Sequence, residues 1–471
     1  MAAAVPAGKM DDALRKEIDL FVEENKERLI ADIARLVAVP SVESAAQEGA
    51  PFGPGPRKAL DTALEIARDL GLKTVDCEHY LGYAVVGEDR EDYLASIVHV
   101  DVVPVGEGWE SDPWTVIEKE GYLFGRGVMD DKGPAVIMLY ALKYLQEKGI
   151  PLKYPFRAMM GANEESGMGD LEYYLEHYPE PLFCFSPDAD FPLINGEKGI
   201  VHGLIRSACR MENILEIEGG HAVNAVPSLA KALVRAKELK PAPRVEAEKE
   251  GEGIWRLTAH GIGGHASMPA GTVSAIGELY DYILENKLAS PAEEAFLRFA
   301  VKIPHAPDGN LVGVAADDGL FTPLTLVSGR VYAEDGHIVQ SLDFRFPTNT
   351  NRELLLKNLQ EVAGDLATVE LDQAADPFYK DPDCAELRAC MDAYNEVTGE
   401  QAKPFTIGGG TYARHFKNAV AFGPEHPERP YPSFAGSIHG ANEAARISDM
   451  LEALKVYIVT LLNLEALEYP C

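Results

Sequence analysis

Three absences narrow the class of protein. The 471-residue sequence has no apolar run of the about 20 residues that a membrane helix needs, so we expect no membrane partner. Its first ten residues lack the apolar core of a signal peptide, so export is not expected. The cysteines show neither a CxxC pair nor the spacing of a disulfide framework, which predicts reduced thiols in a cytoplasmic protein; they are Cys77, Cys184, Cys209, Cys384, Cys390 and Cys471.

The chain is also short of positive charge. It has 43 lysines and arginines against 75 acidic residues, a formal net charge of -32. Because nucleic-acid phosphates are bound by a surplus of Lys and Arg, we expect no nucleic-acid partner. A surplus of acids attracts metal cations and cationic ligands instead.

What the sequence does contain is an alternation of helix-like and strand-like segments. An amphipathic helix closed by Pro40 and a second helix ending at Gly71 come first, and strands then alternate with helices, which favours an α/β architecture. From about Gly196, after a turn-rich stretch over 194–199, the pattern becomes that of an inserted α+β module. The predicted division is therefore 1–195, 196–382 and 383–471, with the first and last parts forming one domain.

Four strand-like segments run directly into acidic residues or histidine. The side chains at their ends are His99 and Asp101; Asp130 and Asp131; Glu164 and Glu165; and Asp188 and Asp190. Taken singly, each is compatible with a solvated turn or a helix cap. In open α/β sheets, however, sites collect outside the carboxyl ends of strands, so the recurrence predicts that these side chains converge.

The spacing within two of these groups indicates that their two members have different roles. In an extended His-x-Asp, both side chains share a face, so Asp101 can hold one ring nitrogen of His99 and leave the other for a metal. Adjacent residues do not share a face, so one of Glu164 and Glu165 can bind a metal while the other points toward a different atom.

The central module and the last ninety residues add polar candidates. His265 lies in a glycine-rich stretch that allows close approach to a ligand. For Asn224 and Arg345, a turn cap and a salt bridge within the module are alternatives to substrate contact. A triple-glycine turn ending at Gly410 can present backbone N–H groups, and Arg414 follows it with a guanidinium suited to a carboxylate.

Seven motifs taken together resemble one enzyme family. HVDVVP, GRGVMDDKG, NEESG, SPDADFP, GGHASMP, GGGTYAR and HGANE occur in this order and cover nearly the whole chain. They are similar to those of the co-catalytic zinc metallopeptidases, which include aminoacylases, glutamate carboxypeptidases and, most similar to this chain, PepV-type dipeptidases. The resemblance implies a phosphorylase/hydrolase-like α/β fold, an open mixed sheet with helices on both faces, and a large inserted α+β lid domain.

The resemblance also implies a role for each candidate. Asp130 would bridge two metal ions across a cis Asp130–Asp131 peptide, with His99 and Asp188 completing one site and Glu165 and His439 the other. Glu164 would be the general base, and Asp101 would support His99. The residues implied to face the substrate are His265, Asn224, Arg345, Arg414 and Gly410, with either arginine as the carboxylate clamp.

The function that follows from the resemblance is that of a metal-dependent dipeptidase. It would cleave dipeptides with a free C-terminal carboxylate by a water that two metals activate; an N-acyl amino acid amidohydrolase or a carboxypeptidase of the same fold is the alternative. The expected cofactors are two zinc ions, with manganese or cobalt possible because imidazole and carboxylate ligands do not separate them. A metal-binding or scaffold protein that retained the fold and lost activity is a further alternative. The large insertion predicts a monomer, the cysteine pattern predicts a cytoplasmic location, and the resemblance implies small peptides as substrates.

Overall fold

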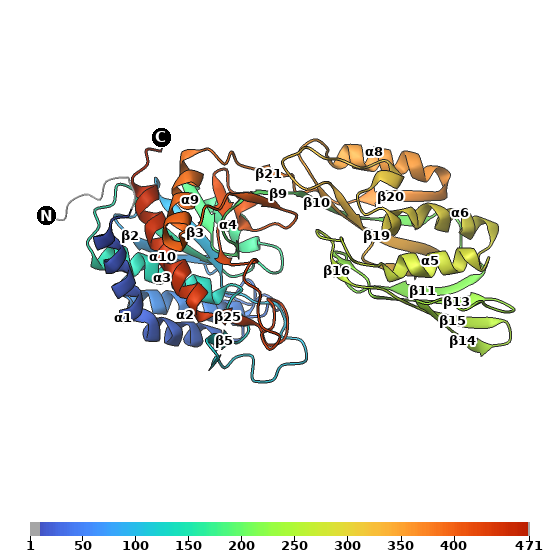
Figure 1. Ribbon diagram of the computed structural model, residues 1–471, viewed down its shortest axis with the longest axis horizontal. Coiled ribbons are helices and arrows are strands. Elements are labelled where there is room, and N and C mark those ends of the chain that lie inside the picture. Colours follow the sequence, from blue (N-terminus) through green and yellow to red (C-terminus); the bar gives the residue numbers. More distant parts are fainter. Residues whose placement is uncertain (1–9, 470–471) are drawn as a thin grey trace. The chain divides into compact units, whose positions relative to one another are not determined.

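The computed structural model describes residues 10–469, which form two compact units (Figure 1). Unit 1 holds the chain up to Asn195, Lys380–Phe405, and the chain from Thr411 onward. Unit 2 holds Gly196–Tyr379 and Thr406–Gly410. The short segment 406–410, which the sequence division puts in the last domain, joins unit 2 because Lys198 N–H donates to the Ile407 carbonyl at 3.0 Å and Thr406 Oγ1 donates to the Leu320 carbonyl at 3.2 Å.

Unit 1 is built on a mixed sheet in the order β1-β2-β6-β3-β7-β23-β9-β21, with β22 beside β9. Its central strands β6, β3, β7 and β23 are parallel. Every residue of β3, β6 and β7 is buried, as expected for parallel strands covered on both faces. The bounds are β1 Lys73–Cys77, β2 Leu81–Val86, β3 Leu94–His99, β6 Phe156–Gly161, β7 Phe183–Ser186, β9 Ile194–Glu197, β21 Phe378–Tyr379, β22 Phe405–Ile407 and β23 Ala419–Ala421.

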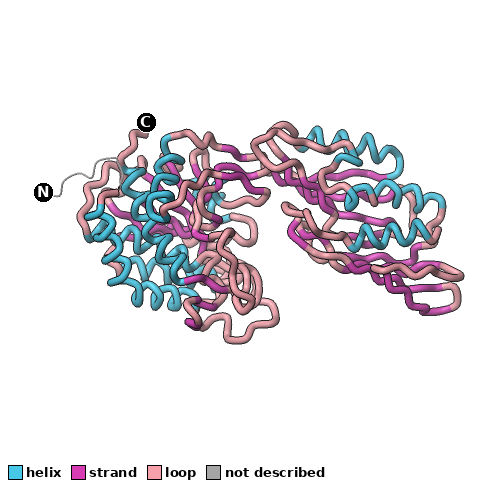
Figure 2. Tube along the Cα trace, viewed as in Figure 1, coloured by secondary structure: helices cyan, strands magenta, loops and turns pink. Residues whose placement is uncertain are grey.

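Helices cover both faces of this sheet, which confirms the predicted fold class (Figures 1 and 2). A side chain at Gly82 would meet Leu64 of α2, whereas one at Gly161 would meet Tyr412 and Asp170. Leu81 pairs with Gly161, so Gly82 and Gly161 point to opposite faces. The helices of unit 1 are α1 Asp12–Val37, α2 Pro54–Asp69, α3 Lys132–Glu147, α4 Gly169–His177, α9 Ala385–Thr398, η3 Tyr412–His415 and α10 Ile447–Glu465.

Two short pairings lie outside the main sheet. A three-stranded sheet has the order β25-β5-β4, with β4 at Ile117–Lys119, β5 at Tyr122–Phe124 and β25 at Ala444–Arg446. A parallel pair joins β8 (Ala189–Asp190) to β24 (Pro424–Glu425). The strand that leads into Asp130 is therefore not a strand of the main sheet, and this corrects the expectation that all four site segments end at one sheet edge.

Unit 2 is an α+β module, as predicted, with a sheet in the order β14-β15-β13-β11-β18-β19-β10-β20 and β17 beside β19. The predicted turn-rich stretch over 194–199 is wrong, because β9 and the start of β10 occupy it. Bounds are β10 Gly199–Ser207, β11 Ile214–Gly219, β13 Leu229–Arg235, β14 Val245–Gly251, β15 Ile254–His260, β17 Thr325–Val327, β18 Val331–Glu334, β19 His337–Phe346, β20 Ala367–Leu371, α5 Ala275–Glu285, α6 Pro291–Ala300, α7 Lys302–His305, η1 Asn310–Val312, α8 Arg352–Ala363 and η2 Gly364–Leu366.

A separate ribbon in unit 2 pairs β12 (Ala225–Val226) with β16 (Gly264–His265). Among residues 10–469, no helix combines the length and apolarity that crossing a bilayer requires. The thiols of Cys77, Cys184, Cys209, Cys384 and Cys390 are free. Cys471 and the first nine residues, on which the sequence also carried expectations, lie outside the described residues.

Candidate metal centre

Three parallel strands bring four of the candidate side chains to one edge of the main sheet. His99 is the last residue of β3, Glu164 and Glu165 follow the end of β6, and Asp188 follows the end of β7. Since β3 runs parallel to both β6 and β7, their carboxyl ends meet at the same edge. These four residues therefore converge at the carboxyl ends of parallel strands, as predicted from the sequence.

Asp130 and His439 reach the same place from the small sheet. Phe124 of β5 pairs with Ala444 of β25, so the loop after β5 lies beside the loop before β25. His439 Nε2 consequently lies 2.8 Å from Asp130 Oδ2. The Asp130–Asp131 peptide between β5 and α3 is cis, as the resemblance implies.

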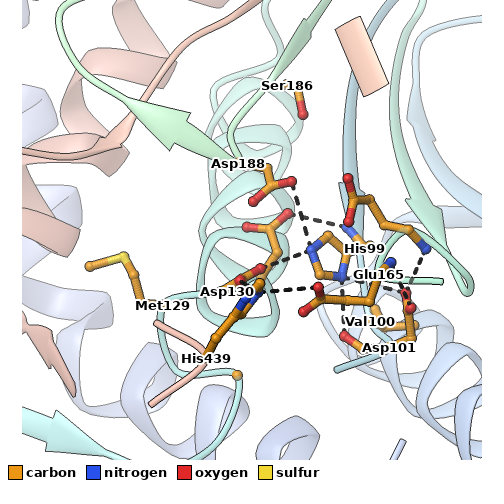
Figure 3. A network of polar contacts seen from close by, with 12 residues as sticks. His99, Val100, Asp101, Met129, Asp130, Glu165, Ser186, Asp188 and His439 are labelled. Carbon is orange, nitrogen blue, oxygen red and sulfur yellow. Dashed lines mark hydrogen bonds and ion pairs between the residues drawn. The ribbon is translucent and has the colours of Figure 1, made fainter. Parts of the chain in front are cut away.

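The five side chains form two groups that share Asp130 (Figure 3). In the first, His99 Nε2 lies 2.9 Å from Asp130 Oδ1 and 3.7 Å from Asp188 Oδ2. In the second, His439 Nε2 lies 2.8 Å from Asp130 Oδ2 and 3.1 Å from Glu165 Oε2. Asp130 thus offers one carboxylate oxygen to each group.

The residues present fit two divalent cations. Imidazole nitrogens and carboxylate oxygens are the ligand types that zinc and neighbouring divalent metals take. His99 Nδ1 lies 3.1 Å from the Asp101 carbonyl, which can only accept, so Nδ1 carries a hydrogen and Nε2, which faces Asp130, is the ring nitrogen left for a metal ion. Glu165 Oε1 is buried and has no hydrogen-bond partner among the described residues, so this oxygen is available to bind a cation.

The electrostatics of the two groups favour positive charge. Hydrogen bonds to Asp130 and Glu165 raise the pKa of His439 to about 10. Burial raises the pKa of Asp188 to about 7. Burial also raises the pKa of Asp130, but its contacts with His439 and His99 outweigh that effect and hold it below the usual value. Protons on the histidines here balance carboxylate charge that cations would otherwise balance.

Glu164 belongs to neither group, yet it lies in the same buried region. Burial, followed by the charge of Asp188, raises the pKa of Glu164 well above the usual value. Its backbone N–H donates to Asp101 Oδ1 at 3.1 Å, and that of Glu165 donates to Asp101 Oδ2 at 3.2 Å. Asp101 Oδ1 also lies 3.4 Å from His99 Nδ1, so one carboxylate orients both His99 and the Glu164–Glu165 turn.

Two further carboxylates, Glu443 and Asp170, hold the backbone around the two groups, and no sequence motif indicated this role. Glu443 accepts from the backbone N–H groups of Gly127, Met129 and Asp130 and pairs with buried Arg126. Asp170 accepts from the N–H groups of Ala162 and Asn163 and from the Tyr412 hydroxyl, at 2.6, 2.9 and 2.6 Å. Glu443 lies in the HGANE motif, but nothing in its spacing assigned it a partner 317 residues away.

The candidates of unit 2 gather around the β12–β16 ribbon and β19. Ala266 N–H donates to the Asn224 carbonyl at 2.9 Å, which ties Asn224 to the strand that carries His265. The Ser267 N–H donates to His265 Nδ1 at 3.3 Å, so neutral His265 carries its hydrogen on Nε2. Partial burial and then the charge of Arg345 lower the pKa of His265.

Arg345 forms the salt bridge within the module that the sequence left as one alternative. Its Nε and one terminal nitrogen donate to Asp343 at 2.7 and 3.0 Å, and the other terminal nitrogen donates to the Gly408 carbonyl at 3.1 Å. Gly410 is exposed at the end of the same glycine turn, which lies in unit 2. Arg414 lies in η3 of unit 1 and is partly buried.

The fold and the two groups that share Asp130 are those expected of a two-metal peptidase, and comparison with known proteins identifies the family. The sequence profile of peptidase family M20/M25/M40 matches residues 95–463, so the chain belongs to this family. YtjP of Bacillus subtilis, which carries a dipeptidase name, is 29% identical over 93% of this chain and 97% of its own. A Beta-Ala-Xaa dipeptidase of Lactobacillus delbrueckii subsp. lactis is 29% identical over 93% and 96%. Human carnosine dipeptidase 1 shares the fold, with a TM-score of 0.61 at 14% identity over 98% of this chain and 100% of its own.

Proposed function

We propose that this peptidase is a metal-dependent dipeptidase, which hydrolyses dipeptides that carry a free C-terminal carboxylate. The observation that carries the proposal is the pair of groups sharing Asp130, with the Glu164 carboxylate beside them in neither group. The dipeptidase names of the relatives support the substrate class.

In the proposed site, His99, Asp130 and Asp188 hold one cation, and Asp130, Glu165 and His439 hold the other. Zinc is the proposed metal, with manganese or cobalt as alternatives. Such cations supply Lewis acidity, which lowers the pKa of a water molecule from about 15.7 to about 7.

Glu164 is the proposed general base. Its raised pKa suits a carboxylate that takes a proton from water and returns it to the leaving amine, a role worth roughly a hundred- to ten-thousand-fold in rate. Asp101 keeps Glu164 in place through the backbone N–H of that residue, at 3.1 Å. His265, whose Nε2 carries the hydrogen, is the proposed donor to the oxyanion that forms at the scissile carbonyl.

Asn224, Gly410 and an arginine are proposed to bind the rest of the substrate. A guanidinium suits the terminal carboxylate because it can donate two parallel hydrogen bonds. Arg345 is already bound by Asp343, which fixes its orientation. Measuring KM for dipeptides and their C-terminal amides with Arg345→Met and Arg414→Met identifies the clamp, because its loss abolishes the preference for the free carboxylate.

A substrate panel tests the proposal. Protein stripped of metal with a chelator and reloaded with zinc, manganese or cobalt would be offered free dipeptides, N-acetylated dipeptides and tripeptides. We expect activity on free dipeptides that requires metal. A preference for N-acetylated substrates would instead identify an N-acyl amino acid amidohydrolase, and cleavage of longer chains from the C-terminus would identify a carboxypeptidase.

A monomeric state and a cytoplasmic location are also proposed, from the size of the insertion and from the sequence. Sedimentation at micromolar concentration tests the first, and a dimer would contradict it. Cell fractionation tests the second.

A further inference from the structure

Glu443 and Arg126 form a buried ion pair beside the candidate metal centre. Both residues are 0% exposed, and an Arg126 terminal nitrogen donates to Glu443 Oε2 at 2.6 Å. The other oxygen, Oε1, accepts from the backbone N–H groups of Gly127, Met129 and Asp130 at 3.0, 3.1 and 3.3 Å. One carboxylate therefore fixes the backbone that leads into Asp130.

The same pair also holds the segment that carries His439. The second terminal nitrogen of Arg126 donates to the His439 carbonyl at 3.3 Å, and Glu443 lies four residues beyond His439. His439 adopts a φ of 60°, a left-handed conformation that costs energy for a residue with a side chain and needs support from its surroundings. The ion pair thus joins the two loops whose side chains meet at 2.8 Å.

The two groups depend on this pair to different degrees. The first group shares Asp130 with the second, but its other two side chains, His99 and Asp188, come from the ends of β3 and β7 in the main sheet. Within residues 10–469, neither Glu443 nor Arg126 forms a hydrogen bond with His99 or Asp188, so only one of the three ligands of this group depends on the pair. The second group needs His439 and Asp130 at a set separation, and both loops are fixed by Glu443 and Arg126.

We propose that Glu443 and Arg126 are positioning residues that set the separation of Asp130 and His439 and thereby create the second cation site selectively. This inference rests on the proposed two-cation function. It assigns a role to two buried charged residues that belong to neither group.

Glu443→Gln is the main test variant, because an amide keeps an acceptor oxygen for the three N–H groups but leaves Arg126 without its counter-charge. Arg126→Lys keeps the charge and loses the planar fork, and the double variant Glu443→Gln/Arg126→Met removes both charges. Glu293→Gln is the matched control. Glu293 is likewise 0% exposed and accepts from several backbone N–H groups, including those of Glu212 and Ile214, but it lies in unit 2 and touches neither group.

The readout is zinc binding to metal-depleted protein, by titration calorimetry and elemental analysis, with circular dichroism to verify folding. We expect wild type and Glu293→Gln to bind two ions. In Glu443→Gln and Arg126→Lys, one ion should bind about as tightly as in wild type and the other roughly ten- to a hundredfold more weakly, as loss of a ligand's supporting contact usually costs. Crystals of zinc-loaded Glu443→Gln should show the loss at His439 and Glu165, and excess zinc should restore kcat.

Three results overturn the proposal. They are two ions bound to Glu443→Gln as tightly as to wild type, equal weakening of both ions in a folded variant, and loss at the His99 group instead of the His439 group. If the single variants do not fold, the double variant decides, since the same selective weakening is expected there. Failure of wild type itself to bind two ions would refute the proposed function and not this inference alone.

Discussion

At the scale of single residues, Asp130 decides what the site can do. Its two carboxylate oxygens lie 2.9 Å from His99 Nε2 and 2.8 Å from His439 Nε2. A residue that serves two groups at once constrains both, so the surrounding side chains must hold it from several directions.

Motif residues on strand ends could be found from the sequence because ligand chemistry requires particular residue types there. Glu443 and Asp170 could not, because a carboxylate that binds backbone N–H groups leaves no characteristic spacing.

Replacing Glu164 by Gln removes the proposed base and leaves the two groups intact. We expect kcat to fall by roughly a hundred- to ten-thousand-fold, because proton transfer from water loses its acceptor. Metal content should stay at that of wild type, since Glu164 belongs to neither group. Steady-state kinetics beside elemental analysis checks both; unchanged kcat would remove Glu164 from the mechanism, and loss of metal would make it a ligand.

Because Lys132 is buried, the free energy of unfolding is expected to depend on pH, and the burial sets the sign of that dependence. The lysine ammonium donates to the Val39 carbonyl at 2.7 Å, and burial lowers its pKa from 10.5 to about 7, partly offset by Glu443 and Asp101. Between these values the unfolded chain binds a proton that the folded chain does not. Its contribution to stability is therefore fully present above pH 10.5 and is lost as the pH falls through about 7.

The contribution of Lys132 can be measured by comparing wild type with Lys132→Met, both depleted of metal. The difference in free energy of unfolding, wild type minus variant, should rise from pH 7 to pH 10 by on the order of 1 kcal/mol per pH unit. Urea titrations at three pH values measure it. A difference that stays flat over this range would show that Lys132 keeps its proton when folded.

At the scale of elements, the site is assembled from two sheets. The main sheet supplies His99, Glu165 and Asp188, and the β25-β5-β4 sheet brings Asp130 to His439. The parallel strands could be predicted because they are buried apolar runs followed by polar ends. The strand-like segment before Asp130 was predicted and is β5, but its pairing with β25 was not. β25 has three residues, too few for a period, and it pairs Ala444 with Phe124, which is distant in sequence.

His265 lies at the end of β16 in the β12–β16 ribbon, with its ring held in place by a neighbouring residue. The ring is held by Ser267, whose N–H and hydroxyl lie 3.3 and 2.7 Å from Nδ1. His265→Ala should lower kcat by roughly a hundred- to a thousandfold, as loss of an oxyanion donor does. Ser267→Ala should cost only a few-fold, because the backbone N–H still fixes the ring. Equal, small effects of both changes on kcat would place His265 outside the reaction.

At the scale of the whole molecule, the inserted module could be foreseen because its strands alternate and its helices are amphipathic, unlike the buried parallel strands on either side. The exact boundary could not. Thr406–Gly410 joins unit 2 through hydrogen bonds from residues distant in sequence, including Lys198 to Ile407.

Metal removal should destabilise the folded chain, because cations that bind only the folded state stabilise it by mass action. With free zinc at 100 times the dissociation constant, each ion should contribute about 2.7 kcal/mol. Calorimetric unfolding with zinc and with a chelator measures the shift in Tm. Asp130→Ala serves as the control, because it should unfold at the same temperature with zinc and with the chelator. A wild-type Tm that is the same in both conditions would contradict metal binding by the folded chain.

Whether two cations share Asp130 can be measured by anomalous diffraction from zinc-loaded crystals. We expect two zinc peaks, one ligated by His99, Asp130 and Asp188 and the other by Asp130, Glu165 and His439. A single peak, or peaks that do not contact Asp130, would contradict this expectation.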